Sequence, residues 1–187
     1  MSIIIGADIS MRSSALVAID STGQVIDFKI ISSDNSEYND EKLLLFNSSE
    51  VLNFMDRFCK DTFSVKIEYL SLKSTAGLMD RIIGNHWNIR TSIFQKYGIL
   101  PSTVSPQAWK KNVYTRDDLD IILLARKNKT SKAKLKKLQK ELCLQKLDKP
   151  LVDMYYEYIR LNKLPKGAIY DLSDATHIAR YGLANGE

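Results

Sequence analysis

The chain has 187 residues, of which 44% are hydrophobic and 26% charged, with a formal net charge of +5. This composition is typical of a globular protein, and the length suits one α/β domain rather than a disordered chain. Its two cysteines lack CxxC or Cys/His spacing, and its apolar runs fall short of the ~20 residues that span a bilayer, so we expect no zinc motif, no disulfide framework and no membrane partner. The N-terminus does not resemble a signal peptide, which favours a cytoplasmic location.

The first thirty residues predict three antiparallel strands. Residues 3–9 form an apolar run that contains Asp8, and a polar turn separates it from a second apolar run at 15–19. The turn signal at 21–24 precedes a third apolar segment at 25–31. We therefore expect a three-stranded meander.

The next part of the chain predicts a connection, a helix and a strand. Residues 32–47 are polar and favour an irregular segment. Ser48 and Ser49 can cap a helix over about 50–60. A strand over 64–70 follows it.

A long helix is predicted for residues 75–97. Apolar residues recur there at three-to-four spacing, and Gly98 favours termination. A short strand at 103–104 follows. The Ser105-Pro106 pair then favours the start of a short helix that ends near residue 114.

The last third of the chain is basic and helical. Residues 126–149 hold ten Lys or Arg residues and two acidic ones, a local charge of +8 that leaves about −3 for the remainder. A local basic patch suits a polyanion-binding surface, although a solvated lysine-rich helix fits equally well. Pro150 separates this segment from a helix over 151–161, and a final helix begins near Asp171. We expect a single domain over 1–187 with a basic helical insertion at about 115–165.

Four acidic residues stand out against their surroundings. Asp8 and Glu68 lie on apolar strands, where a carboxylate needs water, a cation or a hydrogen-bond donor. Asp171 and Asp174 are three residues apart at the start of a helix and share one face. If the strands are neighbours, all four side chains face one point.

Grouped carboxylates repel one another, and a divalent cation is the usual compensation. Ligand sets made only of oxygen atoms favour Mg²⁺ or Mn²⁺ over zinc. Considered singly, each residue has a structural alternative: Asp171 and Asp174 can stabilise a helix N-terminus, Asp8 can belong to a turn, and Glu68 can form a salt bridge. The joint pattern favours a metal site.

Three segments carry a family resemblance. IIIGADISMRSSALVAID, KIEYLSLKS and YDLSDATHIA resemble, in order and approximate spacing, the acidic motifs of RuvC-type Holliday junction resolvases, and VSPQAWKKNVY resembles the basic stretch after the fifth strand. The resemblance implies a ribonuclease-H-like fold: a mixed five-stranded sheet, antiparallel over its first three strands and then parallel, flanked by helices. It points to a divergent viral or phage member, which would act in the host cytoplasm.

The resemblance also implies a chemistry and an assembly. Asp8, Glu68, Asp171 and Asp174 would be the catalytic residues and would bind two Mg²⁺ ions, with Mn²⁺ as a substitute. Asp8 would bridge the two ions. The protein would be a homodimer that packs through the helix at 75–97. At Ser71 the chain departs from the family, many members of which carry an aromatic wedge residue there.

The function predicted on this basis is metal-dependent endonuclease cleavage of Holliday junctions and other branched DNA. The DNA-binding candidates are lysines that would neutralise phosphates: Lys73, Lys110, Lys111, Lys132, Lys134, Lys136, Lys137 and Lys140. Two alternatives stay open: a nuclease acting on flaps, forks or RNA, and a nucleic-acid-binding module without catalysis. An actin-like kinase is excluded because it needs two such domains. His177, one turn after Asp174, is more often an ordinary buried residue than a ligand.

Overall fold

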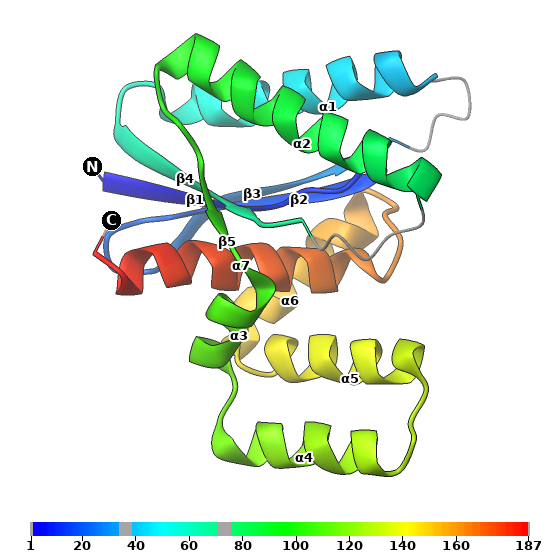
Figure 1. Cartoon of the computed structure of the whole chain (residues 1–187). Coiled ribbons are helices and arrows are strands. Elements are labelled where there is room, and N and C mark those ends of the chain that lie inside the picture. Colours follow the sequence, from blue (N-terminus) through cyan, green and yellow to red (C-terminus); the bar gives the residue numbers. More distant parts are fainter. Residues whose placement is uncertain (1, 34–38, 71–75, 187) are drawn as a thin grey trace.

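A computed structural model describes residues 2–33, 39–70 and 76–186 (Figure 1). Over these residues, every helix is too short or too polar to cross a membrane. Their core is a sheet between two layers of helices, with α1 and α2 over one face and α7 and α6 over the other.

The sheet has five strands in the order β3-β2-β1-β4-β5. The strands are β1 (Ser2–Asp8), β2 (Ser13–Ile19), β3 (Val25–Ser32), β4 (Thr62–Glu68) and β5 (Ser102–Val104). The first three strands pair antiparallel, whereas β4 runs parallel to β1 and β5 runs parallel to β4. The predicted mixed sheet, a meander followed by parallel strands, is confirmed.

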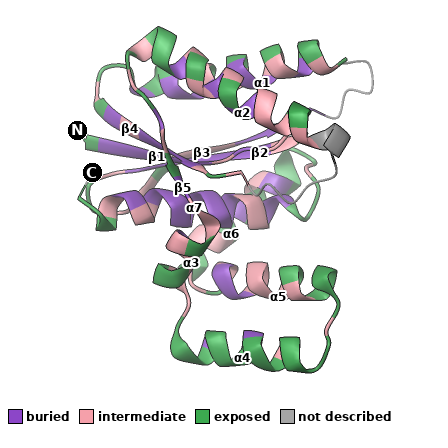
Figure 2. Cartoon of the chain, viewed as in Figure 1, coloured by how far each residue is buried: buried purple, intermediate pink, exposed green. Residues whose placement is uncertain are grey.

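Alternation along β1 explains why helices cover both faces of the sheet. Ile3 and Ile5 are buried in the same cluster as Phe54 of α1 and Ile89 of α2. Ile4, between them, is buried in the second cluster with residues of α6 and α7. Successive side chains of a strand point to opposite faces, so an uninterrupted apolar strand requires helices on both. Figure 2 shows β1 and most of α7 as buried.

The described helices are α1 (Asp40–Met55), α2 (Ala76–Tyr97), α3 (Pro106–Val113), α4 (Arg116–Lys127), α5 (Lys132–Leu144), α6 (Lys149–Leu161) and α7 (Ala168–Ala184), with a short 3₁₀ helix at Asp56–Phe58. The predicted long helix, the short helix after Ser105 and the terminal helix are confirmed. The stretch predicted as a basic insertion contains α4, α5 and α6, and α4 lies with α5 at the end of the molecule remote from α1 (Figure 1).

The prediction for the first helix was wrong at both ends. The helix starts at Asp40, within the segment expected to be irregular, and ends at Met55. Its N-cap is Asn39, whose side chain accepts a hydrogen bond from the backbone N–H of Lys42 at 3.0 Å. Ser48 lies inside the helix, where its hydroxyl donates to the carbonyl of Leu45. A serine can satisfy its hydroxyl in this way in mid-helix, so it does not mark a helix start by itself.

Helix α4 was not predicted as a separate element, whereas the helix predicted after Pro150 is present as α6 and begins one residue before that proline. Thr115 and Asp118 form a reciprocal capping box that starts α4. Pro150 lies in the first turn of α6, where its missing N–H costs no helical hydrogen bond.

Candidate active site

Two of the four predicted carboxylates end neighbouring parallel strands. In the register of β1 and β4, Ala7 pairs with Ile67, so the next residues, Asp8 and Glu68, lie side by side where the strands end. Both side chains are partly buried. The strand pairing expected from the sequence therefore brings these two acids together.

Helix α7 brings the other two acids to the same place. It crosses the sheet over β1 and β2, with its N-terminal end near the end of β1 that carries Asp8 (Figure 1). Asp171 lies in its first turn, and Asp174 follows one turn later and is 4% exposed. The helix can lie so close because β1 has a glycine at position 6: a Cβ there would be 2.2 Å from the carbonyl oxygen of Ala175 and 2.5 Å from the backbone nitrogen of Ala179.

Electrostatic effects link Asp8 to the other three acids. The pKa of Asp8 is raised well above its usual value, first by burial and then by the negative charges of Glu68, Asp174 and Asp171. Burial also raises the pKa of Asp174 to about 6, against the opposing effects of the Lys140 and Lys110 ammonium groups. The protein therefore holds Asp8 and Asp174 where ionisation is costly.

One lysine enters the group. Lys140 Nζ donates to Asp171 Oδ1 at 2.9 Å and lies 3.7 Å from Asp174 Oδ2. Its side chain is 22% exposed. Burial lowers the pKa of Lys140, but the negative charges of Asp171, Asp174 and Asp8 outweigh that effect and raise the pKa. In this structure Lys140 thus contacts carboxylates, although the sequence predicted it as a phosphate ligand.

Two further residues orient the acids and were not predicted as site residues. Trp109, fully buried on α3, donates its indole N–H to Glu68 Oε1 at 2.9 Å. Ser13 donates its hydroxyl to Asp171 Oδ2 at 3.1 Å. The segment VSPQAWKKNVY, which contains Trp109, was noted for its lysines. The tryptophan itself was the only signal in the sequence for this role, because a buried tryptophan needs an acceptor for its N–H.

The donor set fits a hard divalent cation, since all four side chains offer carboxylate oxygens. Asp174 Oδ1 is buried and makes no hydrogen bond in the structure, so it has an unused acceptor. With the side chains as placed, no group of three or more His, Cys, Asp or Glu residues in the described ranges is close enough to hold a metal ion directly. Lys140 supplies the positive charge that contacts Asp171 and Asp174.

His177 has a structural role. It is buried, its Nε2 lies 2.9 Å from the carbonyl oxygen of Cys143, and its ring stacks on Trp109 at 6.1 Å. Burial lowers its pKa to about 4, so the ring is neutral at physiological pH.

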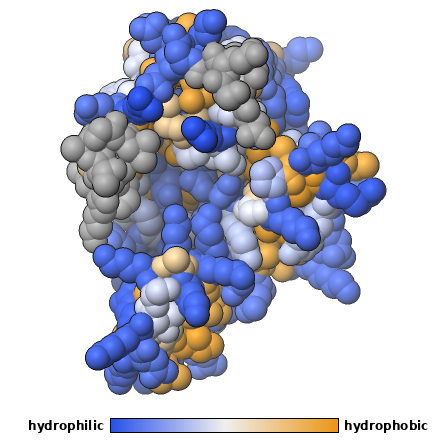
Figure 3. Space-filling model, turned by 90° about the vertical axis from the view of Figure 1, so that its right-hand side faces the viewer, coloured by the Kyte–Doolittle hydropathy of each residue, from blue (hydrophilic) through white to orange (hydrophobic). Residues whose placement is uncertain are grey.

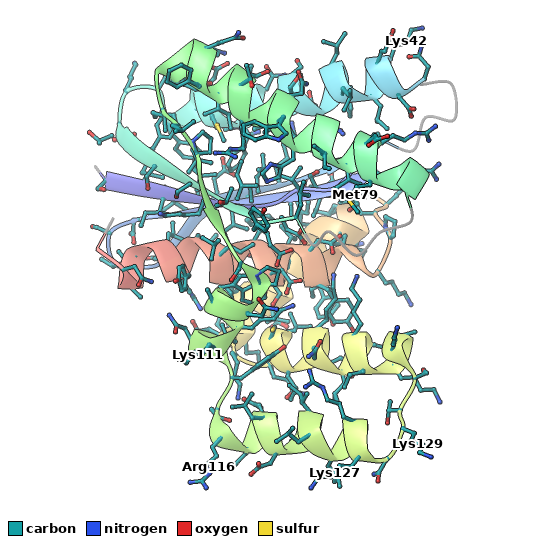
Figure 4. The ribbon with its side chains drawn as sticks, in the orientation of Figure 1. Lys42, Met79, Lys111, Arg116, Lys127 and Lys129 are labelled. Carbon is teal, nitrogen blue, oxygen red and sulfur yellow. The ribbon has the colours of Figure 1, made fainter. Side chains whose placement is uncertain are left out.

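The surface at the end of the molecule where β1 ends and α7 begins is hollowed, and hydrophilic side chains predominate around the hollow (Figure 3). Lys110 is near enough to affect the pKa of Asp174. Lys111 projects from α3, and Arg116, Lys127 and Lys129 lie on or just after α4, at the far end of the molecule (Figure 4). The other predicted phosphate ligands on α5 are exposed: Lys132, Lys134, Lys136 and Lys137. Lys73 and Ser71 lie outside the described residues.

Comparisons with known proteins find the fold but no sequence family. No family model matches the sequence, and no curated protein matches it. Among solved structures, the chain is similar to Thermus thermophilus RuvC in complex with a Holliday junction substrate, with a TM-score of 0.63 and 11% identity over 100% of this chain and 97% of that chain. It is also similar to a structure of Thermus thermophilus RuvC alone, with a TM-score of 0.60 and 12% identity over 96% and 92% of the two chains. At this identity the likeness establishes the ribonuclease-H-like fold, which confirms the fold expected from the sequence.

Proposed function

We propose that the protein is a metal-dependent endonuclease that cuts branched DNA, with four-way junctions as its main substrate. The observation that carries the proposal is the convergence of Asp8, Glu68, Asp171 and Asp174 where β1 and β4 end beside α7. The similarity to a structure that contains a Holliday junction supports this choice of substrate. A ribonuclease-H-like nuclease acting on flaps, forks or RNA is the alternative within the same chemistry.

Two Mg²⁺ ions held by the four carboxylates would supply Lewis-acid activation of the scissile phosphate and of the attacking water. The protein's part is to hold the oxygens in place. The indole N–H of Trp109 fixes one oxygen of Glu68, and the hydroxyl of Ser13 fixes one oxygen of Asp171. Groups that orient a ligand in this way typically affect metal affinity or activity by about 10- to 100-fold.

The lysines of α3 and α5 are proposed to bind the DNA backbone. Lys110 lies beside the carboxylates, whereas Lys132, Lys134, Lys136 and Lys137 are exposed along α5. Contacts of this kind fix the position of DNA without reading its sequence, and they make binding weaken as salt rises. Their arrangement predicts selectivity for shape more than for base sequence.

The proposed assembly is a homodimer through α2. Two large aromatic side chains of this helix are more than half exposed, Trp87 at 56% and Phe94 at 53%. Exposed aromatic side chains are enriched at protein interfaces. A symmetrical pair of sites would suit the paired cuts that resolve a four-way junction.

The test is a cleavage assay on matched substrates. Purified protein should cut a four-way junction in Mg²⁺ or Mn²⁺ and should cut a linear duplex of the same sequence far more slowly. Asp8→Asn should reduce cleavage by more than about a hundredfold, because it removes a ligand rather than a group that merely orients one. It should keep junction binding, since it removes a negative charge from the DNA-facing site.

The outcomes separate the alternatives. Equal cleavage of flaps or RNA would replace the junction as substrate while keeping the chemistry. Full activity of Asp8→Asn would refute the assignment of the site. Junction binding without any cleavage in either metal would favour the non-catalytic binding module.

A further inference from the structure

Lys140 occupies an unusual position for a residue of a lysine-rich helix. Its ammonium lies 2.9 Å from Asp171 Oδ1 and 3.7 Å from Asp174 Oδ2, and its side chain is 22% exposed. Lys137, almost one turn earlier on α5, is 69% exposed and pairs at 3.7 Å with Glu141 of the same helix. Lys140 alone of these two points into the carboxylate group.

The packing of α5 against α7 fixes the backbone position of Lys140. Leu142 and Cys143, two and three residues after Lys140, are buried. The carbonyl of Cys143 lies 2.9 Å from Nε2 of His177, on the same helix that carries Asp171 and Asp174. The backbone of α5 is therefore anchored beside the acids, whereas the flexible four-carbon stem of a lysine allows its ammonium to reach more than one partner.

The ammonium and a divalent cation compete for one oxygen atom, Asp171 Oδ1, which Lys140 already binds. An Mg²⁺ ion bound by Asp171 and Asp174 would lie about 2.1 Å from their oxygens. An ammonium group that donates to one of them at 2.9 Å would then face a double positive charge at very short range. The two cannot occupy this side of the site together without strong repulsion.

We propose that Lys140 is a built-in counter-ion of the carboxylate group, which occupies the Asp171 and Asp174 side in the metal-free protein and competes with a divalent cation for it. This inference rests on the proposed metal-dependent function. The proposal predicts that, without DNA, Lys140 weakens the affinity of Asp171 and Asp174 for a divalent cation. A DNA phosphate entering the site offers the ammonium another anion, so DNA binding should strengthen metal binding there.

The experiment measures Mn²⁺ binding to the full chain without DNA, by electron paramagnetic resonance of the free ion or by calorimetry. Lys140→Met removes the charge and retains most of the side-chain length. It should bind Mn²⁺ about tenfold more tightly than the wild type, the effect of removing one close like charge. The control is Lys29→Met. Lys29 lies on β3, its side chain is 23% exposed, and its ammonium pairs at 2.6 Å with Glu50 of α1. It should bind Mn²⁺ like the wild type.

A second measurement covers the case in which Lys140→Met does not fold. In the wild type, the ¹⁵N signal of the Lys140 ammonium should shift when Mg²⁺ is added, because the group leaves Asp171. Equal Mn²⁺ affinity of folded Lys140→Met and wild type, or an ammonium signal that does not change at saturating Mg²⁺, would overturn the inference and leave the proposed function standing. Absence of Mn²⁺ binding in the wild type and in Lys140→Met would overturn both.

Discussion

The close approach of α7 to β1 can be tested by one methyl group. In Gly6→Ala the new Cβ would lie 2.2 Å from the carbonyl oxygen of Ala175, 2.5 Å from the backbone nitrogen of Ala179 and 2.8 Å from the Ala179 Cβ. Two of these three atoms belong to the backbone, so no side-chain rotation relieves the contact. The helix must move outward by about 1 Å to restore van der Waals separation, because the core is close-packed.

The magnitude follows from that shift. Overpacking a core with a methylene-sized group costs about 1–3 kcal/mol, and a backbone clash belongs at the upper end, so we expect the free energy of unfolding to fall by about 3 kcal/mol. The same shift carries Asp171 and Asp174 away from Asp8. A displacement of about 1 Å at a reacting centre can cost about a hundredfold in rate. Gly6→Ala should therefore lose both stability and nuclease activity.

The assay is urea unfolding followed by circular dichroism, with Gly84→Ala as the matched control. A Cβ at Gly84 would meet no atom within 4 Å. Because Gly84 lies within α2, its replacement by alanine should stabilise the helix by about 1 kcal/mol. If Gly6→Ala is as stable as the wild type, or if both variants change stability alike, α7 does not lie on β1 as described.

Two further predictions concern the carboxylates themselves. Trp109→Phe removes the N–H that binds Glu68 and keeps an aromatic ring in the core, so Mn²⁺ affinity and cleavage should both fall by about 10- to 100-fold; unchanged Mn²⁺ affinity would show that Glu68 needs no positioning. The folded pKa of Asp174, about 6, exceeds the ordinary value of 3.8, so the folded state retains a proton that the unfolded state loses. The stability of the metal-free protein should therefore fall by up to about 3 kcal/mol as pH rises from about 4 to 7. Urea unfolding in EDTA should show a smaller fall for Asp174→Asn, and an identical fall in both proteins would contradict this prediction.

The sequence predicted the sheet and its acids because both depend on short-range pattern. Asp8 and Glu68 stand out since each interrupts an apolar strand, and the order of strands then places them together. The residues that complete the site left no comparable local signal. Trp109 meets Glu68 across 41 positions, and Ser13 meets Asp171 across 158. Such contacts arise from helix packing, which periodicity does not specify.

Helix α4 was not predicted from the sequence for a different physical reason. Its large apolar residues are mostly exposed, at Leu119, Ile121, Leu123 and Leu124, and Ile122 alone among these neighbours is buried. Apolar residues on several faces of a helix do not give the one-sided pattern that identifies an amphipathic helix. The capping box at Thr115 and Asp118 was the better signal.

Two buried aspartates, Asp118 and Asp174, differ in how well the fold satisfies their carboxylates. Asp118 is 5% exposed, and its Oδ2 accepts from the backbone N–H and the hydroxyl of Thr115, both at 2.8 Å, and pairs with Lys146 at 2.7 Å. These partners lower the pKa of Asp118 despite its burial. Asp174 is equally buried, yet one of its oxygens has no hydrogen bond, its cation Lys140 is 3.7 Å away, and its pKa rises to about 6. The fold thus satisfies one aspartate fully and leaves an oxygen of the other without a hydrogen bond, which is the pattern that the proposed cation site requires of Asp174.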